Sequence, residues 1–468
     1  MRKIGILSLY LVFTISLTAQ TTVSGGIYQN TVWSISGSPY IVTGSIVVFP
    51  GKTLTIEPGC EILIDNQTTT DIYIEARGGI SMIGAPGNSI RIRTLYDTTA
   101  VGWRGFKCIS SQGGFINADR FSISNAQFPF DVEGNQNVIN YTDCDFSYNQ
   151  QAIRVDSSIV LNSCTFRNND VGVYGWSHFD IIDCQFENNS TAINAYATRF
   201  SSINSTFTSN NIGIQFSSLV FEEMTIDSCT FFTNGIGINE PNNGSITNSI
   251  FDGNSIGIDF AHNCSITNNL IKNNGIGIAA SFEAEVLNNN IATNSTGVAI
   301  TNLTIASLPP VIVNNEICSN ANYNVDNQTN LNLSLETNCF CGLDSAQIEL
   351  FLFDGYDDIT KGLLNYSLFD STCLILYGTV NKFENPAAEI ADHSSFDYKF
   401  ANPVSDWLIL HNTTENTELF LMDVNGKLIK KSSIHQSAFD VRDVKPGVYF
   451  IKFKNNNIYS STRKIIKI

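Results

Sequence analysis

A phrase with a period near 20 residues repeats through the middle of this 468-residue chain. Ile271 and Asn274 stand 20 positions after Phe251 and Asn254, and an Asn follows an apolar anchor by three residues in nine successive repeats. The anchors are Phe146, Phe166, Phe186, Phe207, Phe231, Phe251, Ile271, Ile291 and Ile317. Each apolar run is short and is broken by Asn or Gly, which excludes helices. The period therefore predicts a solenoid of short β-strands.

Each repeat is expected to form one coil of three strands, stacked on the next by parallel hydrogen bonds at a rise of about 4.8 Å. The first strand holds a Gly-Ile phrase, the second a Ser-Ile-Thr phrase, and the third ends at the anchor. A turn former such as Asp143 or Asn248 stands three residues before the anchor. Asn suits the corner after the anchor because it tolerates left-handed backbone angles and bonds to nearby backbone. Stacked Asn amides can also bond along the column.

Coil length varies most at two places, around residues 217–224 and 301–310. Both insertions fall at the corner between the first and second strands of the coil. Insertions on one edge of a solenoid usually mark its working face.

The pattern from about residue 139 to 330 resembles the right-handed parallel β-helix repeats of the pectate-lyase-like superfamily, including its periplasmic copper-maturation type. Residues 33–64 are similar to the first coils of exported β-helix proteins, and residues 338–370 to their closing segment. The resemblance implies an all-β fold, a right-handed parallel β-helix solenoid. We expect it over residues 20–380, with opening coils at 20–138, regular coils at 139–330 and a closing segment at 331–380.

The last part of the chain has another character. Residues 391–468 hold eleven Lys and Arg against eight Asp and Glu, although the whole chain has a net charge of −17. Short alternating strands, with a type I′ turn expected at Asn425-Gly426, predict a small Ig-like β-sandwich over residues 397–468, after a linker at 381–396. An ordinary carbohydrate-binding sandwich is the alternative.

Four features of this segment resemble the type A C-terminal sorting domain of type IX secretion. They are Asn402-Pro403, the stretch from Asp423 to Gly426, Pro446-Gly447-Val448-Tyr449 and the final Lys464-Ile465-Ile466-Lys467. The resemblance implies a Bacteroidetes-type cell, the type IX machinery as a partner, passage across the outer membrane, and cleavage with attachment to surface polysaccharide.

The N-terminus carries an export pattern. Arg2-Lys3 precede an apolar run from Ile4 to Leu17, and residues 17–19 resemble a small-residue cleavage site. Residues 1–19 are therefore predicted to be a Sec signal peptide, and no later stretch reaches transmembrane length. The acidic balance argues against nucleic acid as a partner. The expected location is the outer cell surface or the medium.

Eleven cysteines are an odd number for an exported chain, so at least one thiol is unpaired. Cys144, Cys164, Cys184 and Cys229 all stand two residues before an anchor, and buried free thiols are favoured there over a bridge. No C-x-x-C spacing occurs and the five His are far apart, so no metal or other cofactor is predicted. The acidic run from Asp354 to Asp358 lacks calcium-loop spacing, and a solvated end-cap is favoured over a calcium site.

The outer face of the first strand carries the candidate binding residues. If Ile153, Val173 and their equivalents point inward, the residues that follow them point outward. The candidates for contact with a glycan are Arg154, Asp156, Tyr174, Trp176, Asn194 and Tyr196. Aromatic faces stack on sugar rings and amides bond to hydroxyls, which favours an extracellular or surface glycan as ligand. The resembling enzymes use this face as substrate cleft, and chance scatter of aromatics is the alternative.

Catalysis has weaker support in the sequence. Gly253 to Gly257 match G-x-S-x-G, but they lie at an Asn corner without the strand-turn-helix that a nucleophile requires. Asp156 and Asp259 are five coils apart, about 24 Å, whereas hydrolase carboxylates lie within about 5–9.5 Å. A non-catalytic binding, adhesive or structural protein is therefore favoured. A polysaccharide lyase or glycoside hydrolase is the alternative.

Overall fold

The computed structural model describes residues 20–96, 99–133, 139–155, 158–196, 199–217, 223–301 and 308–371 of the first part of the chain. In the last part it describes residues 399–400, 407–411, 417–422, 427–434, 438–455, 458–459 and 463–467. The chain divides into two compact units, Met1–Ile375 and Leu376–Ile468. The predicted signal peptide (1–19) and linker (381–396) lie outside the described residues.

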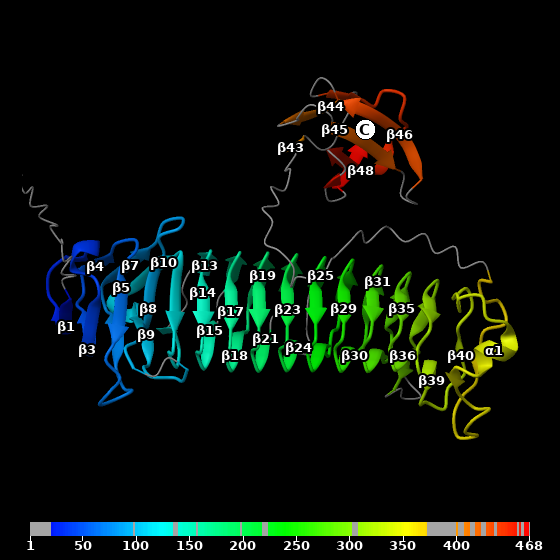
Figure 1. The fold of residues 1–468 in the computed structure, drawn as a ribbon, viewed down its shortest axis with the longest axis horizontal. Coiled ribbons are helices and arrows are strands. Elements are labelled where there is room, and N and C mark those ends of the chain that lie inside the picture. The colour runs from blue at the N-terminus through cyan, green and yellow to red at the C-terminus, as the bar shows by residue number, and fades with distance from the viewer. Residues whose placement is uncertain are drawn as a thin grey trace, which may run out of the picture. The chain divides into compact units, whose positions relative to one another are not determined.

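The first unit is a parallel β-helix, as predicted, with its strands stacked coil upon coil (Figure 1). Every regular coil contributes one strand to each of three parallel sheets. The ten-stranded sheet consists of β15 (Gln151–Val155), β18 (Val171–Gly175), β21 (Thr191–Ala195), β24 (Ile212–Phe216), β27 (Ile236–Asn239), β30 (Ile256–Ala261), β33 (Ile276–Ala280), β36 (Thr296–Ile300), β39 (Tyr323–Asn327) and β41 (Leu352–Phe353). This sheet holds the Gly-Ile phrases.

The Ser-Ile-Thr phrases form the nine-stranded sheet. Its strands are β13 (Ile139–Thr142), β16 (Ile159–Asn162), β19 (His178–Ile182), β22 (Arg199–Ile203), β25 (Glu223–Asp227), β28 (Gly244–Thr247), β31 (Cys264–Thr267), β34 (Glu285–Leu287) and β37 (Val311–Val313). Consecutive strands pair residue for residue, for example Ile246 with Ile266. Residues one sequence period apart therefore lie beside one another in successive coils.

The anchors lie in the 17-stranded sheet, which also runs through the opening coils. Its strands are β1 (Thr21–Ile27), β3 (Tyr40–Val48), β5 (Glu61–Ile64), β6 (Tyr73–Ala76), β8 (Ile90–Thr94), β9 (Gly105–Ile109), β11 (Phe121–Ser124), β12 (Phe130–Glu133), β14 (Asp145–Ser147), β17 (Thr165–Arg167), β20 (Gln185–Glu187), β23 (Thr206–Thr208), β26 (Thr230–Phe232), β29 (Ile250–Asp252), β32 (Leu270–Lys272), β35 (Asn290–Ala292) and β38 (Glu316–Cys318).

The opening coils also contain a four-stranded parallel sheet. It contains β2 (Thr31–Trp33), β4 (Thr53–Ile56), β7 (Gly79–Ile83) and β10 (Phe115–Asp119), with short 3-10 turns at Ile35–Gly37 and Ser110–Gln112. Trp33 and Trp103 are buried here. These coils therefore close the N-terminal end of the core with large side chains.

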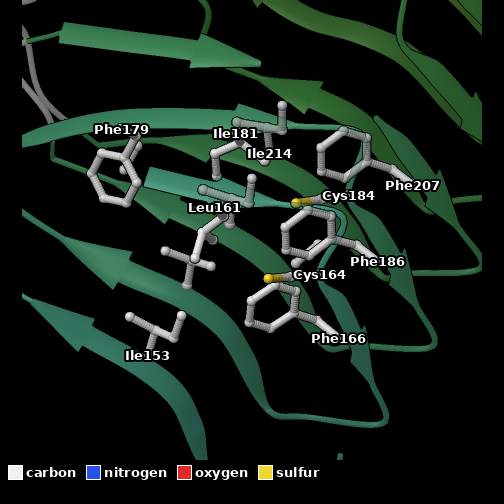
Figure 2. Close-up of a cluster of buried hydrophobic side chains, with 14 of the residues drawn as sticks. Ile153, Leu161, Cys164, Phe166, Phe179, Ile181, Cys184, Phe186, Phe207 and Ile214 are labelled. Carbon is white, nitrogen blue, oxygen red and sulfur yellow. The ribbon is translucent and has the colours of Figure 1, made fainter. Parts of the chain in front are cut away.

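Stacked phenylalanines fill one side of the core, as Figure 2 shows for Phe166, Phe186 and Phe207. The rings of Phe166 and Phe186 are parallel within 6°, with centroids 4.7 Å apart. Centroids at this separation lie within the range of favourable aromatic contacts. Leu161 and Ile181 lie across the core from these rings and are also fully buried (Figure 2). The predicted inward columns are confirmed.

The corner asparagines form a buried ladder. The backbone N–H and the Nδ2 of Asn189 both donate to Oδ1 of Asn210 at 2.9 Å, and Nδ2 also donates to the carbonyl of Phe166. The same bonds recur from Asn149 to Asn320. Bonding along the column is therefore confirmed.

The left-handed backbone that we expected at these asparagines is instead adopted by the residue before each of them. Positive φ occurs at Tyr148, Asn168, Asn188, Ser209, Thr233, Gly253, Asn273, Thr293 and Ser319. Each ladder Asn must direct its amide into the core, so the chain reverses one residue earlier. The predicted turn formers three residues before the anchors do have positive φ, as at Asp143 and Asn248.

Two residues before each anchor, a second polar column lies inside the coil. It begins with the thiols of Cys144, Cys164 and Cys184, which are free and buried as predicted. It ends in another amide ladder, in which Asn269 donates to Asn289 at 2.9 and 3.0 Å. The sequence analysis did not predict this ladder, although Asn269, Asn289 and Asn315 each stand two residues before an anchor.

The closing segment ends the core. It contains β40 (Leu333–Ser334), β42 (Leu364–Asn365) and α1 (Ser345–Glu349), which begins at an Asp344 capping box. Asp354 was expected in a solvated end-cap, but it is fully buried. Its two carboxylate oxygens accept hydrogen bonds from the backbone N–H groups of Tyr356 and Leu364. Asp354 thus supplies acceptors to backbone donors inside the end of the solenoid, whereas Asp357 in the same run stays exposed.

The second unit contains two antiparallel sheets, which agrees with a small β domain. One sheet contains β43 (Lys399–Phe400), β44 (Trp407–His411) and β47 (Ala438–Asp440). The other contains β45 (Thr417–Met422), β46 (Leu428–Ile434), β48 (Gly447–Asn455), β49 (Ile458–Tyr459) and β50 (Arg463–Lys467). β45 and β46 form the predicted hairpin, and its turn at Asn425-Gly426 lies outside the described residues.

Candidate functional site

The candidate residues share one column on the outer face of the ten-stranded sheet. Strand register places Arg154, Tyr174, Asn194, Gln215, Asn239 and Asp259 beside one another in successive coils. The residues that precede them, from Ile153 to Ile258, are buried. The alternation expected of a strand therefore directs this column to solvent.

Tyr174, Trp176 and Tyr196 form a cluster of three rings at the end of β18 and β21. The Trp176 and Tyr196 ring centroids lie 5.8 Å apart, with their planes inclined by 34°. Tyr174 meets both edge-on, with centroids 4.7 Å from Trp176 and 5.7 Å from Tyr196. Edge-to-face contacts of this kind are favourable, so Tyr174 fixes the other two rings. Trp176 keeps 42% of its surface exposed.

Arg154 is the residue beside Tyr174 in the preceding coil. Its side chain is exposed, and its guanidinium carbon lies 5.8 Å from the centroid of the Phe128 ring. A cation over an aromatic face is held there electrostatically. Phe128 belongs to the opening coils, outside the regular repeat, so the sequence carried no signal for this contact. Asp156 lies outside the described residues, and its place among the candidate residues remains a prediction.

Amide and hydroxyl side chains continue the column beyond the rings. Ser217 Oγ donates to Asn194 Oδ1 at 3.1 Å, and Asn239 Nδ2 donates to Gln215 Oε1 at 2.7 Å. Gln215 Nε2 donates in turn to the carbonyl of Phe216 at 2.7 Å. These bonds hold the amide planes in fixed orientations. The result is a preformed row of hydrogen-bonding groups next to the ring cluster.

An aliphatic column runs parallel to this row on the same sheet. Register aligns half-buried Ile212, Ile236, Ile256 and Ile276 in four successive coils. The sequence analysis missed it, although each member precedes Gly in a repeated Ile-Gly-Ile phrase that signals it. The face therefore offers an apolar strip beside a polar one.

Two carboxyl groups occupy the polar column at its far end. Burial raises the pKa of Asp259 above its ordinary value, and burial does the same for Asp326. Asp259 is three coils from Asn194, about 14 Å at the usual strand spacing. Asp326 is about three coils further, so the described residues of this column bring no two carboxylates within hydrolase distance.

In the chain, one coil insertion follows β24 and the other follows β36, both strands of the ten-stranded sheet. Most of their residues (218–222 and 302–307) lie outside the described part of the structure. The ring cluster lies at the same type of corner, between β18 and β19. The candidate residues and the variable corner thus share one edge of the solenoid.

Elsewhere in the structure, three side chains of types that can bind a metal lie close together. Glu316, Cys318 and Cys341 place ligand atoms within 4.8 Å of one another. Cys318 and Cys341, however, are joined by a disulfide, which fixes the closing segment to β38. Because the two sulfurs are bonded to each other, they do not serve as thiolate ligands for a metal ion.

The comparisons with known proteins concern the tail and the solenoid separately. Residues 400–468 match the family of the secretion system C-terminal sorting domain, which confirms the predicted sorting domain. No curated protein matches the chain. Among solved structures, the A-module of the mannuronan C-5 epimerase AlgE6 of Azotobacter vinelandii is 13% identical, over 69% of this chain and 90% of that chain, with a TM-score of 0.33. Within the described residues, no helix has the length and apolarity needed to cross a membrane.

Proposed function

We propose that this protein is exported, displayed on the cell surface by its sorting domain, and binds a glycan along the outer face of the ten-stranded sheet. The sorting domain at residues 400–468 supports delivery by the type IX pathway, after removal of a signal peptide at residues 1–19. The binding role is adhesive or structural and needs no catalysis.

The exposed ring cluster is the observation that carries the binding proposal. Trp176 is 42% exposed although it belongs to a well-packed solenoid, and Tyr174 and Tyr196 hold its ring in place. Rigid aromatic surface of this kind stacks on the C–H faces of sugars, and the adjacent amides pair with hydroxyls. Because the rings already pack against one another without ligand, we expect little conformational entropy to be lost on binding.

A glycan array with the mature full chain, followed by calorimetry with the best ligand, tests the proposal. Trp176→Ala should weaken binding by about 1.5–3 kcal/mol, the scale of burying a large apolar side chain. Tyr356→Ala is the matched control, because Tyr356 is an exposed ring in the closing segment. Equal loss in both variants, or no loss in either, would contradict this location of the site.

A lyase or hydrolase is the second candidate, and one observation favours it. Asp259 lies in the same outward column and its burial raises its pKa, as general acids require. A reducing-sugar assay and an unsaturated-product assay on the bound glycan distinguish the two functions. Activity that disappears in Asp259→Asn, with binding retained, would establish the enzyme.

A further inference from the structure

Charged side chains are scarce on the outer face of the ten-stranded sheet. Strand register aligns two columns on this sheet, the outward one from Arg154 to Asp326 and a half-buried one from Gln151 to Tyr323. Their described members carry one cation, Arg154, and two carboxylates, Asp259 and Asp326. The other members are aliphatic, aromatic, amide, hydroxyl or alanine side chains. The face thus has no row of positive charge along the direction in which the coils stack.

We infer that the ligand of this face is an uncharged polysaccharide that lies along the stacking direction of the coils. This inference rests on the proposed glycan-binding function and names the class of ligand. A polyuronate carries a carboxylate on every ring and needs either repeated cations or bridging metal ions.

The cations near this face do not form a row. Arg154 is followed in its column by Tyr174 and Asn194. Arg199, at the start of β22 beyond the ring cluster, is already paired with Glu223 at 3.7 Å. Beyond the amides, an anionic chain would meet Asp259. Like charges at short distance repel, and screening weakens this repulsion only beyond about 8–10 Å.

Metal bridging lacks the necessary ligands as well. Calcium takes six to eight oxygens at about 2.3–2.6 Å. Asp259 and Asp326 stand about three coils apart, or about 14 Å, so they cannot share one ion. No other carboxylate occupies the described positions of these two columns. Exposed Glu240, directly after β27, bonds through its backbone to Asp259 and adds one carboxylate there, which still falls short of the six oxygens that calcium takes.

The uncharged features, in contrast, extend over several coils. The amides of Asn194, Gln215 and Asn239 stack in sequence, and Ile212, Ile236 and their neighbours run beside them. A neutral sugar chain presents hydroxyls at its edge and C–H groups on its ring faces. Laid along the coils, it matches a polar row and an apolar row at once, and the ring cluster holds one of its rings.

Calorimetry with the mature full chain tests the ligand class. The neutral probes are xyloglucan, galactomannan and laminarin, and the anionic probes are alginate and polygalacturonate, each with and without calcium. We expect a neutral polymer to bind, with affinity at least tenfold weaker in Trp176→Ala and changed less than twofold between about 0.05 and 0.5 M salt. The control Tyr356→Ala, at an exposed ring in the closing segment, should change this affinity less than threefold.

The outcomes separate the inference from the proposed function. Binding of alginate or polygalacturonate that depends on Trp176 and exceeds that of every neutral probe would overturn the inference and retain the proposed function. If no probe binds in a manner that depends on Trp176, both are wrong. Neutral-probe binding that falls tenfold or more with added salt would also overturn the inference.

Discussion

Asn274 Oδ1 accepts two hydrogen bonds from Asn254, one from its backbone N–H and one from its Nδ2, both at 2.9 Å. The same Nδ2 donates to the carbonyl of Phe231 at 3.0 Å. One amide thus connects three successive coils. Since both asparagines are almost fully buried, water cannot replace these bonds.

Asn254→Ala should lower the free energy of unfolding by at least about 2 kcal/mol, because it leaves buried donors and acceptors of Asn234, Phe231 and Asn274 without their partners. Chemical denaturation measures the change. The control is Asn322→Ala, whose Nδ2 donates to Ser295 in an exposed contact, and it should cost far less. Similar losses in the two variants would show that the ladder is not a main source of stability.

Ile258 and Ile256 belong to one strand but differ in burial. Ile258 is fully buried and Ile256 is half-buried in the outer aliphatic column. Ile258→Ala should therefore cost about 2–5 kcal/mol, and Ile256→Ala distinctly less. Ile258→Asp should disrupt the local coils, because it places a charge in an apolar column. Unchanged thermal unfolding of Ile258→Asp would refute the inward column.

Cys229 should make the protein less stable at alkaline pH. Burial raises the pKa of its thiol to about 11, from about 8.5 in an unfolded chain. The folded state therefore keeps a proton that the unfolded state releases. Below about pH 8 the Cys229 thiol is protonated in both states and does not lower the free energy of unfolding. As pH rises toward the folded pKa, the free energy of unfolding decreases by about 1.4 kcal/mol per pH unit.

Cys229→Ser is the matched variant for this measurement. Ser249 occupies the same column one coil later, and its hydroxyl donates to the carbonyl of Thr247 as Cys229 Sγ donates to that of Asp227. Serine should therefore fit, and the variant should lose less stability than wild type between about pH 8 and 10. Parallel pH profiles would contradict a buried, protonated thiol.

Deletion of residues 397–468 should leave the protein in the periplasm, because the match to the sorting domain lies within this segment. Cell fractionation with an antibody against the solenoid measures the location. The solenoid is a separate compact unit, so it should still fold. As a complementary test, the segment fused to a periplasmic reporter should deliver it to the surface. Normal surface display of the truncated protein would refute the sorting role.

Most of the candidate site follows from strand alternation alone. Once the coil period is known, Ile153 and Val173 must point inward, and Arg154 and Tyr174 outward. The sequence could not give the ring geometry, since the edge-on position of Tyr174 depends on rings from two coils. Nor could it indicate Phe128, which reaches Arg154 from outside the regular repeat.

The sequence by itself determined the solenoid, its coil length, its inward columns and its sorting tail. It could do so because parallel in-register stacking turns a repeat along the chain directly into a column in space. Only the tertiary structure decided which corner residue turns left-handed, where the second amide ladder runs, and that Asp354 is buried. These features depend on hydrogen bonds and packing between residues from different coils, and the order of residues along one coil does not specify such contacts.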